Sequence, residues 1–144
     1  MEAPTYQELV AEIAAFFNAH QGVGSFINAQ TYDAQTMQNT YICVILVPQS
    51  SELGEGMMRL RFVAYVCELL NEDKSNATTA YNDTLAIATD FVAYFAANRC
   101  REWNIEEPVS LEPFEEKFDD NVCGWGISFT CAVPYYGDSC TIPM

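Results

Sequence analysis

Residues 123–133 alternate between bulky apolar and small side chains, and this pattern constrains the fold more than any other stretch. The two sets are Cys123, Trp125, Ile127, Phe129, Cys131 and Val133 against Gly124, Gly126, Ser128, Thr130 and Ala132. Because side chains alternate between the two faces of a strand, a period of two predicts a strand with one core face. The face of small residues is flat enough for a helix or another subunit to approach closely.

The same geometry argues against chemistry at these cysteines. Along an extended strand, Cys123 and Cys131 lie about 26 Å apart at ~3.3 Å per residue. They can neither form a disulfide with each other nor share a metal ion. We therefore expect the segment to pack rather than to react.

Two segments have the apolar spacing of helices. Residues 5–20 start with Thr5 and Glu8 at capping-box spacing, and Gly22 is expected to end this helix. Residues 77–97 are expected to form the main helix, which has one apolar face and mostly alanines on the rest of its surface. The residues expected on the two apolar faces are Tyr6, Leu9, Ile13, Phe16 and Phe17 in the first, and Tyr81, Leu85, Ala88, Phe91, Val92 and Phe95 in the second.

Three further strands are expected before the second helix. Residues 40–48 are continuously apolar, residues 57–70 begin with alternating apolar and basic side chains, and residues 25–34 form a weaker strand. The glycines and serines of residues 49–56 predict a loop. In the acid-rich residues 102–120, Val109 and Leu111 suggest a short strand, and Phe114 and Phe118 are expected to hold the segment against the core.

These elements predict an α+β fold in a single domain, residues 1–144. We expect a mixed or antiparallel β-sheet packed by an N-terminal helix and one long central helix. At 144 residues the chain can bury roughly two-thirds of its unfolded surface, so it needs no disulfides or metals to fold.

The charge is strongly acidic, with 20 acidic and 6 basic residues and a formal net charge of −14. Nucleic-acid phosphates would repel such a chain unless its bases were clustered. The small clusters Arg59–Arg61 and Arg99–Arg101 are too few for a phosphate-binding surface. Good solubility is the simplest explanation, and a surface that must not adhere to a nearby polyanion is the sharper one.

The six cysteines are expected to be reduced and mostly buried. The first residues carry early acids and no basic segment, which argues against a secretory leader. The cysteines are separated by 23, 32, 22, 7 and 8 intervening residues, unlike the paired spacing of a zinc site. The single histidine, His20, at the end of a helix, gives no sign of catalysis. We therefore expect no catalytic, metal or cofactor-binding residue and no enzymatic activity.

The C-terminal third carries a recognisable series of motifs. Its landmarks are Pro113-Phe114, Phe118-Asp119-Asp120, Gly124-Trp125, Val133-Pro134 and Cys140-x-Ile142-Pro143. With the upstream segments YICVILVP and YNDTLAIATDFVAYF, they resemble structural proteins of tailed bacteriophages of the crAss-like type, which infect Bacteroidetes. The resemblance covers most of the chain, and its motifs are packing motifs.

The resemblance implies a tail-terminator-like or neck ring protein, which assembles as a cyclic homo-oligomer between portal and tail while DNA passes through the ring without specific binding. It favours a dodecamer, with a hexamer as the alternative. The implied location is the virion neck or tail, after assembly in the host bacterial cytoplasm. Portal, neck and tail proteins would be its neighbours, no membrane would be involved, and no cofactor is implied.

Two segments are the expected contact regions for subunits or neighbours, namely the loop 49–57 and the tail 135–144. The residues chosen are Gln49, Glu52, Leu53, Glu55, Met57, Tyr135, Tyr136, Ile142 and Met144. The alternatives are a mobile solvent loop for the first segment and packing of the tail on its own domain for the second.

Two other functions remain open from the sequence. The acid-rich residues 102–120 suit a soluble binding module that mimics nucleic acid or inhibits a DNA-binding protein. An enzyme would need an unrecognised site, for which Cys140 and His20 are the candidates.

Overall fold

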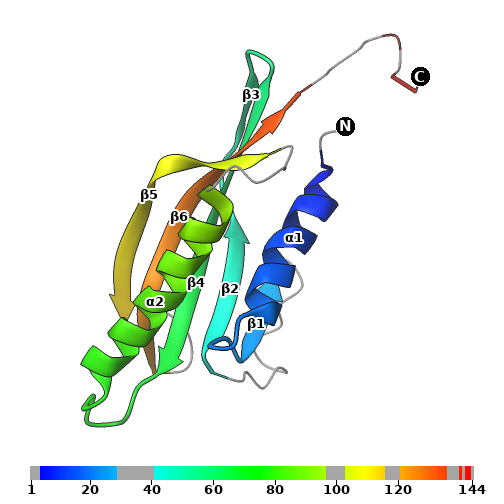
Figure 1. The fold of residues 1–144 in the computed structure, drawn as a ribbon. Coiled ribbons are helices and arrows are strands. Elements are labelled where there is room, and N and C mark those ends of the chain that lie inside the picture. Colours follow the sequence, from blue (N-terminus) through cyan, green and yellow to red (C-terminus); the bar gives the residue numbers. More distant parts are fainter. Residues whose placement is uncertain are drawn as a thin grey trace.

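The structure is a computed structural model that describes residues 4–28, 41–96, 103–115, 121–135, 140 and 142–143. The described residues form two helices and a six-stranded sheet (Figure 1). The elements are α1 (Tyr6–Ala19), β1 (Ser25–Asn28), β2 (Cys43–Pro48), β3 (Glu52–Gly54), β4 (Met57–Leu69), α2 (Ala77–Ala96), β5 (Asn104–Glu115) and β6 (Val122–Pro134).

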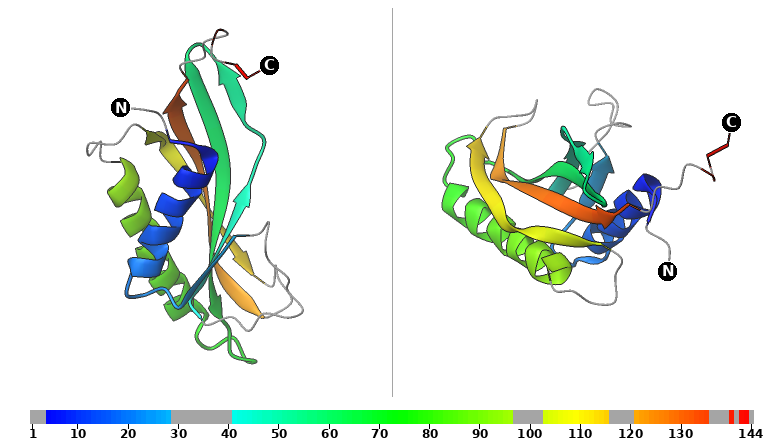
Figure 2. Two further views of the ribbon diagram at one scale, coloured as in Figure 1. Left: turned by 90° about the vertical axis from the view of Figure 1, so that its right-hand side faces the viewer. Right: turned by 90° about the horizontal axis from the view of Figure 1, so that it is seen from above.

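The sheet is mixed, with the strand order β1-β2-β4-β6-β5 and β3 paired to β4 beyond the end of β2. β1 runs parallel to β2, and every other pairing is antiparallel. Both helices cover the same face, as Figure 2 shows from the side and from above. This arrangement confirms the expected single α+β domain, with the N-terminal and the long central helix packed on the sheet.

The main core lies between the helices and this face of the sheet. Aromatic rings hold the layers together: Phe17 of α1 stacks on Phe91 of α2 with ring centroids 5.0 Å apart, and Phe91 contacts Phe129 of β6 at 4.9 Å. Both helix faces were predicted in outline, although Tyr6 is exposed and Leu85 only half-buried. The structure adds Thr84 and Ile87 to the buried face of α2, where the Thr84 hydroxyl donates to the carbonyl of Ala80 at 2.7 Å and so can be buried.

The central strands are longer than the helix layer. β4 and β6 pair over thirteen residues each, which is about 43 Å at ~3.3 Å per residue, whereas the 20 residues of α2 span about 30 Å. One end of the sheet therefore projects past the helices, as Figure 1 shows for β3, the start of β4 and the end of β6. We call this projecting part, residues 49–61 and 134–135, the arm.

The alternation in β6 is confirmed on its core face. Ile127, Phe129, Cys131 and Val133 belong to the main core. Trp125 is half-buried, and its indole N–H donates to the carbonyl of Tyr81 on α2 at 3.0 Å.

The face of small residues serves a different purpose from the expected one, because neither described helix packs on it. A Cβ built on Gly124 would lie 1.8 Å from the carbonyl oxygen of Val66, and one on Gly126 would lie 3.2 Å from the ring of Tyr65. The glycines therefore make room for the neighbouring strand β4 and its side chain. Whether another subunit approaches this face stays a prediction.

Other expectations need correction. The expected loop 49–56 contains strand β3, and the expected short strand around Val109 is the twelve-residue β5. α1 ends at Ala19 with His20 as its C-cap, before Gly22.

Two local expectations are confirmed: Thr5 and Glu8 form the capping box, and Phe114 packs against Tyr65. Residues 29–34 of the first expected strand, and Phe118, lie outside the described residues.

Only the middle of β5 was expected from the sequence, because this edge strand carries acidic residues and two prolines among its apolar ones. Its pairing with β6 shifts register between Glu106 and Ser110, where Pro108 lies. Proline and acidic residues interrupt the apolar alternation that reveals a strand in a sequence, yet they are tolerated at an edge.

Gly124→Ala should destabilise the protein by at least about 3 kcal/mol, since a backbone oxygen cannot move aside as a flexible side chain can. Gly54→Ala is the matched control: a Cβ there meets no atom within 4 Å, so its effect should stay within about 0.5 kcal/mol. Urea unfolding followed by tryptophan fluorescence measures both. Equal stabilities of the two variants would show that β4 and β6 are not packed as described.

Candidate functional site

The arm ends in a tight two-residue turn between β3 and β4. Gly54 pairs with Met57, and the residues between them, Glu55 and Gly56, have φ angles of 54° and 76°. Two successive positive φ angles define a type I′ turn, whose twist matches that of a hairpin. The segment expected to be a solvent loop is therefore an ordered hairpin.

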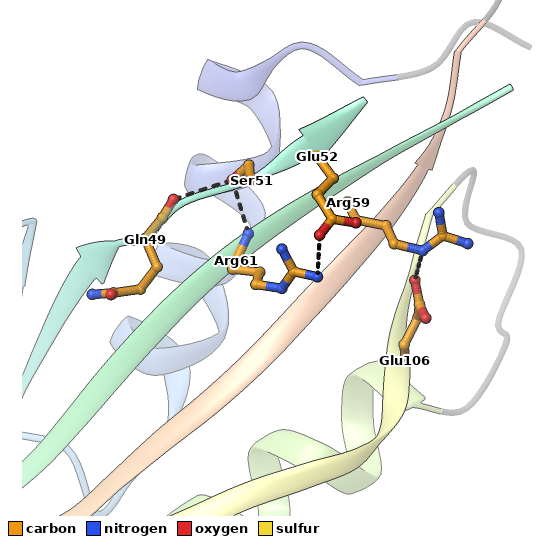
Figure 3. Close-up of polar contacts among 6 residues, drawn as sticks. All are labelled: Gln49, Ser51, Glu52, Arg59, Arg61 and Glu106. Atoms are coloured by element: carbon orange, nitrogen blue, oxygen red, sulfur yellow. Dashed lines mark hydrogen bonds and ion pairs between the residues drawn. The ribbon is translucent and has the colours of Figure 1, made fainter. Parts of the chain in front are cut away.

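The chain between β2 and β3 carries one extra residue. Residues 49–51 lie opposite only two residues of β4, Leu60 and Arg61, because Pro48 pairs with Phe62 and Glu52 with Arg59. This is the count of a β-bulge. Hydrogen bonds close the gap, as Figure 3 shows: the Ser51 hydroxyl donates to the Gln49 carbonyl at 3.2 Å and accepts the Arg61 N–H at 3.1 Å.

Two ion pairs fix the arm, one within the hairpin and one between the arm and strand β5. Arg61 Nη2 lies 3.2 Å from Glu52 Oε1 across the hairpin, and Arg59 Nε donates to Glu106 Oε1 of β5 at 2.9 Å (Figure 3). All four side chains are more than a third exposed, so each pair adds at most about 1 kcal/mol to stability. Their main effect is to orient the arm relative to the rest of the sheet, because the Arg59–Glu106 pair reaches from β4 over β6 to the edge strand β5.

The first residue of the predicted tail segment meets the predicted loop segment in the arm. The backbone N–H of Tyr135, just after β6, donates to the carbonyl of Gly56 in the turn at 2.9 Å. Leu53 at the tip is 61% exposed and Tyr135 is 47% exposed. Large apolar side chains exposed on a rigid projection are typical of a contact surface.

The remaining predicted contact residues are placed as follows. Gln49, Glu52 and Glu55 are exposed on the same hairpin, and Met57 is half-buried. Ile142 is 56% exposed. Tyr136 and Met144 lie outside the described residues.

The sequence analysis did not assign Arg59, Arg61, Ser51 or Glu106 to this site. The alternating Arg59-x-Arg61 pattern did place both arginines on one face of the strand. Nothing in the sequence links them to carboxylates 9 and 47 residues away.

The described bases are all neutralised by acids. Arg59, Arg61 and Lys74 each lie within 3.2 Å of a carboxylate oxygen, and Lys74 pairs with Glu115 at 2.7 Å. Within the described ranges, the surface therefore offers no unpaired cation to a phosphate backbone.

His20 has a structural role at the end of α1. Its Nδ1 accepts the backbone N–H of Gly22 at 3.0 Å, which leaves the proton on Nε2, and Nε2 lies 2.8 Å from Asp90 Oδ2 of α2. Nε2 thus ties α1 to α2, Nδ1 holds the turn after α1, and neither nitrogen faces a cysteine among the contacts described.

Five cysteines are described, and four of them are buried. Cys43, Cys67, Cys123 and Cys131 are buried, whereas Cys140 is exposed. Burial raises the pKa of Cys67 and of Cys131 far above the usual thiol range, and the neighbouring Cys43 and Cys123 add to the effect at Cys67. A thiol without its thiolate form is a poor nucleophile.

Among the described residues, no group of three or more histidine, cysteine or acidic side chains is arranged to hold a metal ion. No helix in the same ranges is long and apolar enough to cross a membrane.

Alkylation should distinguish these thiols. With iodoacetamide at pH 8, Cys140 should react at least about a hundredfold faster than Cys67 or Cys131, which react only when the fold opens. Peptide mass spectrometry against time measures each rate, and urea-unfolded protein is the control in which the rates converge. Rapid native labelling of Cys67 or Cys131 would revive a reactive-thiol function.

Glu55→Asn should stabilise the hairpin, because asparagine accepts a positive φ more readily than glutamate in the first position of a type I′ turn. The expected gain is up to about 1 kcal/mol, seen as a higher midpoint in urea. Glu52→Asn, in strand β3 of the same hairpin, should show no gain. A lower stability of Glu55→Asn would contradict the turn type.

Comparisons with known proteins support the fold alone. No protein-family model matches the chain, and no curated protein matches it. A solved structure whose name states no function is similar over 94% of this chain and 100% of its own, with a TM-score of 0.55 and 14% identity. Such a likeness indicates a shared architecture and carries no function across.

Proposed function

We propose that this protein is a virion structural protein that forms a cyclic ring in the neck or tail of a tailed bacteriophage, connecting portal to tail. The sequence resemblance described above is the reason for this class. DNA passes through the ring without specific binding. The favoured assembly is a dodecamer of 16.1-kDa subunits, with a hexamer as the alternative. The subunits are made in the host bacterial cytoplasm and end in the virion.

The single observation that carries the proposal is the arm. It brings the first residue of the predicted tail segment to the predicted loop segment and presents Leu53 and Tyr135 beyond the helix layer. A ring requires two different complementary patches on each subunit, so that the contact repeats around a closed circle. A projection at one end of a domain suits such a head-to-tail contact, because it can bind a different surface on the next subunit.

The electrostatics fit a channel that DNA must traverse. A formal net charge of −14 and the pairing of the described bases disfavour adhesion of the phosphate backbone. Conversely, like-charged subunits repel one another, so apolar contacts such as those of Leu53 would have to supply the association.

Leu53→Asp should convert the assembly to monomers or small oligomers without lowering the thermal midpoint of the subunit, because the wild-type side chain is 61% exposed and packs little in its own domain. Leu69→Asp is the matched control: this leucine is 44% exposed at the opposite end of β4 and should leave the assembly intact. Light scattering after size exclusion gives the masses. A wild-type protein that is strictly monomeric at high concentration would remove the proposal.

Imaging and composition complete the test. Class averages viewed along the symmetry axis should show a closed ring, and they count its subunits directly. Purified virions should contain the protein in a fixed ratio to the portal. Its absence from virions would exclude the structural role.

A second candidate rests on β5. This edge strand carries Glu106, Glu107, Glu112 and Glu115 beside an exposed sheet edge, which suits an acidic binding module that mimics nucleic acid. Capture of a DNA-binding protein, with affinity falling steeply in salt and no ring in solution, would favour it.

A further inference from the structure

A groove runs between the two helices on the side away from the sheet. It has a volume of about 510 Å³, and only residues of α1 and its C-cap and of α2 line it. Figure 2 shows the two helices side by side on this side of the molecule. The small side chains of Ala15 and Ala19 leave space along α1.

Aromatic rings form one wall of the groove. The rings of Phe16 and Tyr94 lie with centroids 5.0 Å apart and those of Tyr94 and Phe95 at 4.9 Å. Phe16 is half-buried and Tyr94 is 45% exposed, so ring surface is accessible from solvent. Such surfaces attract cations through the negative face of the ring, and arginine is the commonest partner.

A carboxylate is held beside these rings. Glu12 precedes Phe16 by one helical turn, and its Oε2 accepts the indole N–H of the buried Trp103 at 2.6 Å. This bond fixes the carboxylate and leaves Oε1 without a partner among the contacts described for Glu12. A fixed carboxylate beside an aromatic surface matches a guanidinium group, which can stack and donate at the same time.

The charge around the groove favours a cation throughout. No described lysine or arginine lines it, and at its other end Asp90 holds His20. The aromatic surface would also attract an apolar side chain, but burying Glu12 under one would leave a carboxylate desolvated without a counter-charge.

We propose that this groove is a binding site for an arginine side chain of a protein partner, with Glu12 as the counter-charge and Phe16 and Tyr94 as the stacking surface. The inference does not depend on ring assembly, because the groove lies within one subunit and away from the arm.

The probe is Nα-acetyl-arginine methylamide, with the citrulline analogue as its control because it has the same shape without the charge. Nitrogen-15 NMR provides an internal reporter. The indole N–H signal of Trp103 should shift on titration, since that group shares Glu12, whereas the indole signal of Trp125, bonded to Tyr81, should not move. The arginine response should weaken with added salt.

Glu12→Gln should weaken arginine binding about tenfold, because a charge-assisted hydrogen bond is stronger than a neutral one, while its amide oxygen still accepts from Trp103. Tyr94→Ala should also weaken it. The matched control is Asp83→Asn, which removes the same charge from an exposed position near the start of α2 and should leave binding unchanged.

Three outcomes would overturn the proposal. The first is an equal response to the citrulline probe, and the second is an equal loss of binding in Asp83→Asn, which would reflect net charge alone. The third is binding only after Arg99 and Arg101 are both replaced by glutamine, which would mean that the chain's own arginines occupy the site.

Discussion

The pairing of β4 with β6 over thirteen residues is the constraint on which the rest of the structure depends. It sets the length of the sheet, and because a strand rises about twice as far per residue as a helix, the helices cannot cover all of it. The excess length becomes the arm. The same pairing requires Gly124 in β6, where a Cβ would collide with a backbone oxygen of β4, and it favours Gly126, where a Cβ would press on the ring of Tyr65. The tryptophan between them then faces α2.

Much of this architecture follows from periodicity. The alternation in β6 and the helical spacing of the two apolar faces predict the core because burial selects for them directly. β3 leaves no such signal, and β5 leaves only a short one at Val109 and Leu111. β3 is three residues long and fully exposed, so no core face marks it, and in β5 the prolines and acids conceal the rest of a strand whose outer edge pairs with no other described strand. The corrected segments are therefore those in which pairing, rather than burial, fixes the backbone.

The candidate contact surface was predictable only in part. Exposed apolar residues near a turn and near the chain end indicate a surface, and two segments were chosen on that basis. That Tyr135 bonds to Gly56 is a consequence of antiparallel register, which cannot be read before strand partners are known. The same holds for Arg59 with Glu106, and for Glu12 with Trp103, 91 residues apart, whose bond orients the carboxylate of the interhelical groove.

The broken register of β5 at Pro108 has a consequence for how copies of this protein can meet. An unbroken outer strand would act as a template on which further chains add backbone to backbone, and growth would not stop. In β5, Pro108 lacks an amide hydrogen, the register shifts locally, and acidic residues lie nearby. Together they interrupt the row of backbone hydrogen-bonding groups that another chain would need for pairing. Contacts at this border must form through side chains, which select their geometry, so a high concentration of copies need not turn them into fibrils.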